Sequence, residues 1–150
     1  MPAEKMKKIV HIHLSEKDVF KSTLTAGQHN FVADEPTSVP GGEDAGPDPY
    51  DLLLMSLGAC TVMTVKMYAR RKKWPLEDLF LELRHYKSHV EDSESIENPS
   101  SRIDLIEKEL IIKGDLSQEQ RDRLLEISSR CPVHRTLMSD IQIDSTLAEN

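Results

Sequence analysis

The fold is decided by residues 48–60, DPYDLLLMSLGAC, which predict the start of a long and very apolar helix. Asp48 is a good N-cap residue, and Pro49 suits the first helical position because its ring fixes a helical φ angle. We expect the helix to end at about Lys73, since the proline of Trp74-Pro75 pushes the tryptophan out of the α region. A helix of this length would form the centre of the fold.

The first half of this helix, up to Cys60, is apolar almost all the way round. Such a helix must be covered on several sides, and one sheet from a chain of this size covers only one of them well. The second half, residues 66–73, is basic and is expected to face solvent. The sequence therefore favours a homodimer in which a second copy covers the rest of the helix.

The rest of the chain reads as short strands and one further helix. Alternating or strand-like apolar patterns predict strands over residues 10–14, 19–25, 29–34, 78–90, 102–113 and 141–145. Ser117 and Gln120 form a capping box for a helix that runs to about Arg130. The proline- and glycine-rich residues 36–49 and the polar residues 91–100 are expected to be loops. This order predicts an α+β fold in a single domain over residues 1–150.

Composition excludes several classes of function. The chain has 150 residues, of which 19 are Lys or Arg and 26 are Asp or Glu, so its formal net charge is −7. A negative charge disfavours nucleic acid, whose phosphates bind basic surfaces, and 5% aromatic residues offer few stacking platforms. The longest apolar run, residues 52–65, is too short and too interrupted to cross a bilayer. We expect neither a nucleic-acid nor a membrane partner.

Cysteine usage indicates a reducing compartment. Cys60 and Cys131 are too few for a disulfide scaffold, and the basic N-terminal residues lack the pattern of a secretory signal. We therefore expect a cytoplasmic protein. No phosphate-binding loop and no Ser/His/Asp arrangement is legible, so the sequence predicts no organic cofactor.

The two cysteines lie in different environments. Cys60 is in the middle of the apolar helix, where a cysteine is more often a small core residue than a nucleophile. Cys131, in Cys-Pro-Val-His-Arg, is placed as the N-cap of a second short helix, where a thiolate is stabilised. The alternative for Cys131 is a plain helix break. Cys131 and His134 also have the spacing of zinc ligands, but no paired motif accompanies them, and we predict no metal site.

Three segments together carry a family signal. They are PGGEDAGPDPYDLL at residues 40–53, LGACT at residues 57–61 and RCPVHRTL at residues 130–137. With this order and separation the chain resembles the OsmC-like family, which includes osmotically inducible protein C and the organic hydroperoxide resistance proteins. The resemblance implies an intertwined α+β homodimer, in which antiparallel sheets of both subunits wrap the long central helices.

The resemblance also implies a chemistry for the cysteines. In the characterised branches the helix cysteine attacks the peroxide and the later cysteine resolves it. For this chain, that makes Cys60 the thiol that reduces an organic hydroperoxide and becomes a sulfenic acid. Cys131 would then close a disulfide that an external dithiol reduces. The expected function is that of a peroxidase in oxidative stress defence.

The activating residues of the characterised branches are not all present here. Those branches stabilise the thiolate with an arginine of an early strand, which a glutamate orients, yet this chain has no arginine before Arg70. Candidate cations are His29, Lys21, His134 and Arg135, and Glu43 or Glu35 is a candidate carboxylate partner. Leu53, Leu57 and Met63 would line an apolar substrate pocket. The alternative is a non-peroxidase protein that binds an apolar small molecule at the dimer interface.

Overall fold

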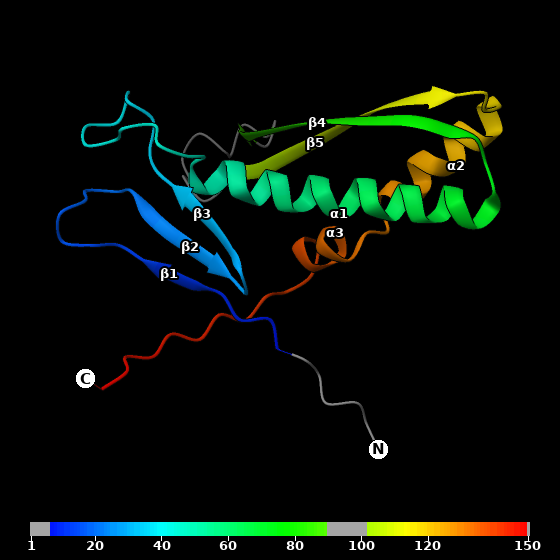
Figure 1. Cartoon of the computed structure of the whole chain (residues 1–150). Helices are drawn as coiled ribbons and strands as arrows, with labels where there is room; N and C mark the ends of the chain where they lie inside the picture. Colours follow the sequence, from blue (N-terminus) through cyan, green and yellow to red (C-terminus); the bar gives the residue numbers. More distant parts are fainter. Residues whose placement is uncertain (1–6, 90–101, 150) are drawn as a thin grey trace, which may run out of the picture. The chain divides into compact units, whose positions relative to one another are not determined.

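The computed structural model of the chain describes residues 7–89 and 102–149. They fall into two compact units, with a boundary between residues 53 and 54. The described elements are antiparallel sheets and helices, one of them long, so the expected α+β class is confirmed (Figure 1). The single domain expected over the whole chain stays a prediction.

The first unit contains a three-stranded antiparallel sheet in the order β1-β2-β3. Its strands are β1 (His11–His13), β2 (Ser22–Ala26) and β3 (His29–Ala33). In the turn between β2 and β3, Gly27 takes a φ of 60°, a conformation that glycine adopts without steric cost. The three strands predicted over residues 10–14, 19–25 and 29–34 are therefore confirmed; each is shorter than predicted, and β2 ends one residue later.

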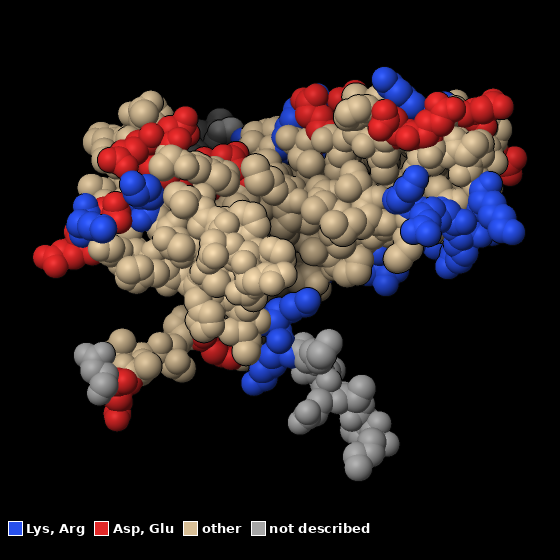
Figure 2. All heavy atoms as spheres, viewed as in Figure 1, with Lys and Arg blue, Asp and Glu red and all other residues tan. Residues whose placement is uncertain are grey.

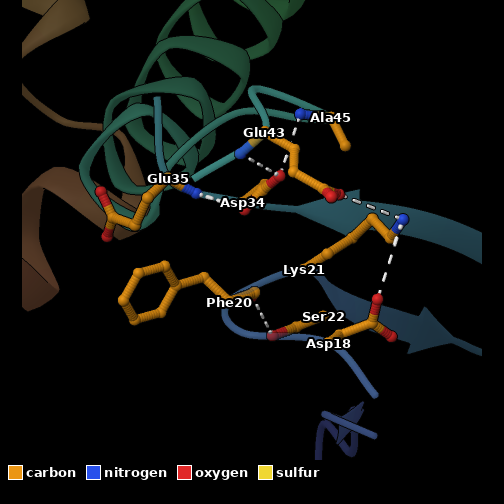
Figure 3. A network of polar contacts seen from close by, with 8 residues as sticks. All are labelled: Asp18, Phe20, Lys21, Ser22, Asp34, Glu35, Glu43 and Ala45. Atoms are coloured by element: carbon orange, nitrogen blue, oxygen red, sulfur yellow. Dashed lines mark hydrogen bonds and ion pairs between the residues drawn. The ribbon is translucent and has the colours of Figure 1, made fainter. Parts of the chain in front are cut away.

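The proline- and glycine-rich loop after β3 is organised by a buried carboxylate, that of Asp34 (Figure 3). Its oxygens accept hydrogen bonds from the backbone N–H groups of Glu35 at 2.8 Å, Ala45 at 3.1 Å and Glu43 at 3.2 Å. Burial raises the pKa of Asp34, but these backbone hydrogen bonds outweigh it and the pKa is lowered. Together with backbone hydrogen bonds such as that from the Asp44 N–H to the Glu35 carbonyl, this side chain holds a segment without helix or strand.

The long helix α1 (Pro49–Lys72) begins where the sequence predicts it. The Asp48 carboxylate accepts from the Asp51 N–H at 2.8 Å, and the Asp51 carboxylate accepts from the Asp48 N–H at 3.1 Å. Lys73 follows the helix with a φ of 58°, and the Trp74 N–H bonds the Ala69 carbonyl at 2.9 Å. This reversal ends the helix one residue before the expected position.

The second unit adds a long hairpin and two helices. Strands β4 (Leu76–His89) and β5 (Arg102–Gly114) pair antiparallel, with Leu81 opposite Leu110 and Leu83 opposite Lys108. The capping box of Ser117 and Gln120 is present and starts α2 (Gln118–Ser128). A short helix, α3 (Pro132–Leu137), follows with Cys131 as its N-cap. The loop predicted over residues 91–100 lies outside the described residues.

The hydrophobic core joins α1 to the hairpin and to α2. Its buried side chains are Val65, Ala69, Leu76, Leu116 and Leu124. Next to it, Gly58 allows α1 to approach β4, because a Cβ at this position would lie 2.9 Å from Cδ1 of Leu83. This close approach fixes the neighbouring residues of α1 against the hairpin.

One predicted element is wrong. Residues 141–145 alternate as a strand would, but in the described part of the chain they belong to no sheet. A strand needs a partner for its backbone groups and a surface that covers its apolar face. Neither is provided here, since the side chain of Ile143 is 82% exposed.

Much of α1 is not covered within the described chain. Met55, Met63 and Met67 are all exposed, and Figure 2 shows basic side chains gathered at the carboxyl end of the helix, beside a broad surface without charge. By length and composition alone α1 could cross a membrane, since an 18-residue stretch of it has a mean hydropathy of 1.5, although core helices of soluble proteins pass the same test. The prediction that this helix needs further cover agrees with its exposed apolar face.

Candidate active site

The second unit brings the two cysteines together. Cys60 lies on α1 and is half-buried, while Cys131 at the start of α3 is 0% exposed. Both thiols are free. The backbone N–H of Val133, two residues after Cys131, donates to Cys60 Sγ at 3.5 Å, so the two cysteines lie near each other. Two residues 71 positions apart in sequence thus form one sulfur pair.

Cys131 is placed by the local geometry of its Cys-Pro sequence. Its backbone is extended, with φ −66° and ψ 145°, and Pro132 begins the helix directly after it. The sulfur can then accept the N–H of His134, at 3.2 Å. On its other side the Thr61 hydroxyl lies 3.5 Å from the sulfur. Cys131 is therefore held between α1 and α3 by polar contacts.

A lysine side chain contacts the residues around the two sulfurs. Lys108 lies on β5, and its Nζ is 2.8 Å from the Ser128 carbonyl oxygen, 3.0 Å from Nδ1 of His134 and 3.2 Å from the Thr61 hydroxyl. These contacts tie the hairpin to α1, to the end of α2 and to α3. We refer to Cys60, Thr61, Lys108, Cys131 and His134 as the thiol cluster.

The cluster is electrostatically unusual. Burial raises the pKa of Cys131, but hydrogen bonds from Thr61, His134 and Cys60, together with the charge of Lys108, lower it overall. Burial lowers the pKa of Lys108, against the opposing effect of the two cysteines. Burial and the charge of Lys108 also lower the pKa of His134, so its imidazole is neutral near pH 7.

Some of the residues that the sequence suggested for activation of the thiol lie together in the structure, and others do not. His134 is in the cluster through its backbone amide and its ring. Arg135 is adjacent in sequence but exposed. His29 and Glu43 belong to the first unit, where His29 pairs with Ala26 on β2 and the Glu43 carboxylate forms an ion pair with Lys21 at 3.4 Å. Their proposed part in activating the thiol stays a prediction.

The expected pocket residues differ in their surroundings. Leu57 is buried, Leu53 is half-buried and Met63 is exposed. Met63 and Met67 line a shallow apolar hollow of about 450 Å³ on α1, together with Leu79 of β4. Among residues 7–89 and 102–149, no group of three His, Cys, Asp or Glu side chains could hold a metal ion.

The sequence interpretation missed Lys108 and Thr61. A signal for Lys108 was available, because period-two alternation along β5 places it on the same face as Ile106, Leu110 and Ile112. Those neighbours are half-buried, whereas Glu107 and Glu109 point to solvent. A lysine among inward-facing aliphatic residues is costly unless it is paired. Its partners, however, come from three other elements.

Chemically, the cluster offers two thiols in mutual reach and a lysine that stabilises negative charge. Thiolates are the reactive form of cysteine, and they are favoured beside cations and hydrogen-bond donors. An oxidised sulfur next to a second thiol can close to a disulfide. The arrangement is therefore suited to reversible thiol oxidation.

Comparisons with known proteins agree on the fold. A family model described as OsmC-like protein matches residues 41–146. An OsmC-like protein from Mycoplasma pneumoniae has a solved structure that superimposes with a TM-score of 0.69 at 21% identity, over 89% of each chain. No match was found among curated proteins.

Two further solved structures carry functional names. One is an organic hydroperoxide resistance protein OsmC from Legionella pneumophila, with a TM-score of 0.62 and 18% identity over 89% of this chain and 90% of that one. The other is an organic hydroperoxide resistance protein from Elizabethkingia anophelis, with a TM-score of 0.63 and 15% identity over 92% of this chain and 94% of that one. At these identities the likeness concerns the fold.

Proposed function

The chain belongs to the OsmC-like protein family, and from this premise we propose that it is a thiol-dependent peroxidase that reduces organic hydroperoxides to alcohols. The observation that carries the proposal is that Cys60 and Cys131 lie near each other, with Cys60 Sγ bonded to the N–H of Val133 and Cys131 Sγ beside Thr61, which Lys108 contacts. The names of the Legionella and Elizabethkingia proteins, both organic hydroperoxide resistance proteins, support it.

The proposed reaction uses the two sulfurs in order. The Cys60 thiolate attacks the distal oxygen of ROOH, the O–O bond breaks, and the alcohol ROH leaves with one proton. Cys60 is then a sulfenic acid. Cys131 attacks this sulfur, the S–O bond breaks, and water leaves as the disulfide forms. An external dithiol reduces the disulfide by exchange and completes the cycle.

Exposure supports this assignment of roles. Cys60 is half-buried and Cys131 is fully buried, so an entering hydroperoxide reaches Cys60 first. Cys131 is held within reach by its contacts to Thr61 and His134. A resolving thiol has to be close to the sulfenic acid, but it needs no contact with the substrate.

The exposed apolar face of α1 supports two further parts of the proposal. Methionine and leucine side chains favour a hydroperoxide with a fatty or aryl group over hydrogen peroxide. They also favour a second copy of the chain as the cover of α1, which makes the proposed working form an intertwined homodimer. Free thiols are consistent with the reducing cytoplasm that we propose as its location.

The test is turnover of cumene hydroperoxide with dithiothreitol as reductant. The reduced wild-type protein is expected to consume peroxide continuously, and Cys60→Ser to consume none. Cys131→Ser is expected to be oxidised once and then to recycle poorly. Equal activity of both variants would contradict the mechanism. Absence of turnover in wild type, with saturable binding of the cognate alcohol, would favour the alternative of an apolar-ligand binding protein.

A further inference from the structure

We propose that Lys108 holds the resting negative charge of the sulfur pair on Cys131, and that this buried thiolate is the base that takes the proton from Cys60. The inference deepens the proposed function and rests on it. It assigns Lys108 as a positioning residue that acts through Thr61, and it gives Cys131 a task before it resolves the sulfenic acid.

The contacts of Cys131 suit an anion. Its sulfur accepts the backbone N–H of His134 at 3.2 Å, and it lies 3.5 Å from the Thr61 hydroxyl. Cys60 is a further neighbour, since its sulfur accepts the N–H of Val133, two residues after Cys131. Each of these groups can donate a hydrogen to the sulfur, and the backbone amide of His134 can act only as a donor. A charged sulfur can accept from the amide and from the hydroxyl at the same time, which favours the thiolate.

Thr61 can adapt to either charge state. Its hydroxyl lies 2.8 Å from the Leu57 carbonyl, as is usual for threonine in a helix, and it has only one hydrogen to donate. When Cys131 is a thiolate, that hydrogen turns to the sulfur, while the threonine oxygen accepts from Lys108 at 3.2 Å. The Thr61 hydroxyl, which accepts from the lysine, therefore donates to the sulfur and stabilises its negative charge.

The Lys108 ammonium group has a neutral hydrogen-bond acceptor for each of its hydrogens, and its positive charge still requires an anion for balance. An ammonium group has three hydrogens, and Ser128, His134 and Thr61 each offer an uncharged acceptor for one of them. Within the described ranges no carboxylate forms an ion pair with it. Its charge interacts with the two thiols. Partial burial makes an unbalanced charge costly.

The single positive charge of Lys108 can balance the negative charge of one thiolate. His134 accepts from the lysine through Nδ1, which requires a neutral ring, so it adds no second positive charge. The other groups that face Lys108 are the Ser128 carbonyl from α2, Thr61 and Cys60 from α1, and Leu83 across the hairpin. None of these supplies another cation. We infer that the pair carries a single negative charge and shares one proton.

The shared proton gives a balanced reaction. The Cys131 thiolate takes the Cys60 proton, and the Cys60 thiolate attacks the distal oxygen of ROOH. The O–O bond breaks, and the alkoxide takes the proton back from Cys131 and leaves as ROH. Cys131 is again a thiolate when it attacks the Cys60 sulfenic acid. The hydroxide that leaves takes a proton from solvent and becomes water, and the disulfide remains.

The first experiment locates the charge by thiolate absorbance near 240 nm as a function of pH in reduced proteins. Cys60→Ser is expected to keep the thiolate signal at pH 7, and Cys131→Ser to lose it. The reverse pattern would overturn the proposal. Lys108→Met is expected to move the titration midpoint of Cys60→Ser upward by about one unit or more, and Lys108→Arg to restore part of the shift. An unchanged titration midpoint in the Lys108→Met variant would show that the lysine does not stabilise the Cys131 thiolate.

The second experiment tests the base. In single-turnover oxidation by cumene hydroperoxide at pH 7, Cys131→Ser is expected to be slower than wild type by about 100-fold, and to recover as the pH is raised. An equal rate at pH 7 would overturn the role of Cys131 as base. If Lys108→Met does not fold, Thr61→Val replaces it in the titration, with the same expected direction. The titration uses no peroxide, so a wrong proposed function and a wrong location of the charge give different results.

Discussion

Nζ of Lys108 lies 3.0 Å from Nδ1 of His134, so two side chains that both carry positive charge in acid share one hydrogen bond. Only a neutral imidazole can accept at Nδ1, and its remaining proton must then be on Nε2. The lysine thus fixes both the charge and the tautomer of the histidine. The helix that begins at Cys131 is tied to β5 by the same bond.

The tautomer is directly observable. We expect the ¹⁵N spectrum of the His134 ring to show a neutral imidazole protonated at Nε2 at pH 7. Burial, and then the charge of Lys108, lower the pKa of His134, so the midpoint of its titration should lie below the usual value of 6.5. In Lys108→Met the ring should titrate at higher pH. Unchanged titration of His134 in that variant would contradict the contact.

Removal of one hydroxyl tests the link between the lysine and the sulfur. Thr61→Val keeps the shape of the side chain but deletes the group that contacts Leu57, Lys108 and Cys131. Loss of a buried hydrogen-bonding group costs about 1–3 kcal/mol of unfolding free energy. We expect a loss in this range and a higher pKa of Cys131. Thr64→Val on the same helix is the control, and an equal effect of both changes would disprove the link.

The fold was predictable where local chemistry decides it. Asp48, Pro49 and Ser117 cap or start helices through contacts within a few residues, and the structure has these contacts. Residues 141–145 show the limit of such reasoning. Alternation indicates which side chains share a face, but a strand also requires a neighbour, which no local pattern supplies.

The candidate site was predictable only in part, for a similar reason. Cys60, Cys131 and His134 lie in recognisable motifs. Lys108 is 23 residues before Cys131 and 48 after Cys60, on another element. Only the pairing of β5 with β4, and the packing of α1 against that hairpin, bring its Nζ to Thr61. Of the candidate cations named from the sequence, His134 lies in the thiol cluster, whereas the roles of His29 and Arg135 stay predictions.

The buried carboxylate of Asp34 should make the first unit sensitive to acid. Its pKa is lowered from 3.8, since the backbone hydrogen bonds to the charged form outweigh the opposing effect of burial. A lowered folded-state pKa contributes stability above pH 3.8 that is lost as the pH falls through the folded-state value. Asp34→Asn should therefore lower the melting temperature at pH 7, and the difference from wild type should shrink below about pH 4. Asp44→Asn is the exposed control, and an equal loss there would contradict this role.

Two adjacent leucines on α2 provide a matched test of the core. Leu124 is 0% exposed and belongs to the cluster with Val65 and Ala69, whereas Leu125 is 55% exposed. Leu124→Ala is expected to cost about 2–5 kcal/mol of unfolding free energy, because it removes contacts and leaves a cavity. Leu125→Ala should change it by about 0.5 kcal/mol or less. Denaturant unfolding measures both free energies. Similar losses in the two variants would show that α2 does not bury Leu124 and expose Leu125.

The exposed methionines of α1 test the proposed dimer. Met67 is 69% exposed, which is costly for a large apolar side chain unless a partner covers it. A carboxylate introduced by Met67→Glu would have Arg70 and Arg71 three and four positions further along the helix, a spacing that supports the helix itself. The isolated fold should therefore survive, while the covered face would acquire a buried charge. We expect light scattering to give the mass of two chains for wild type and of one chain for the variant, with unchanged circular dichroism. Met138→Glu, at the exposed end of α3, should remain dimeric, and a dimeric Met67→Glu protein would show that this face of α1 is not the interface.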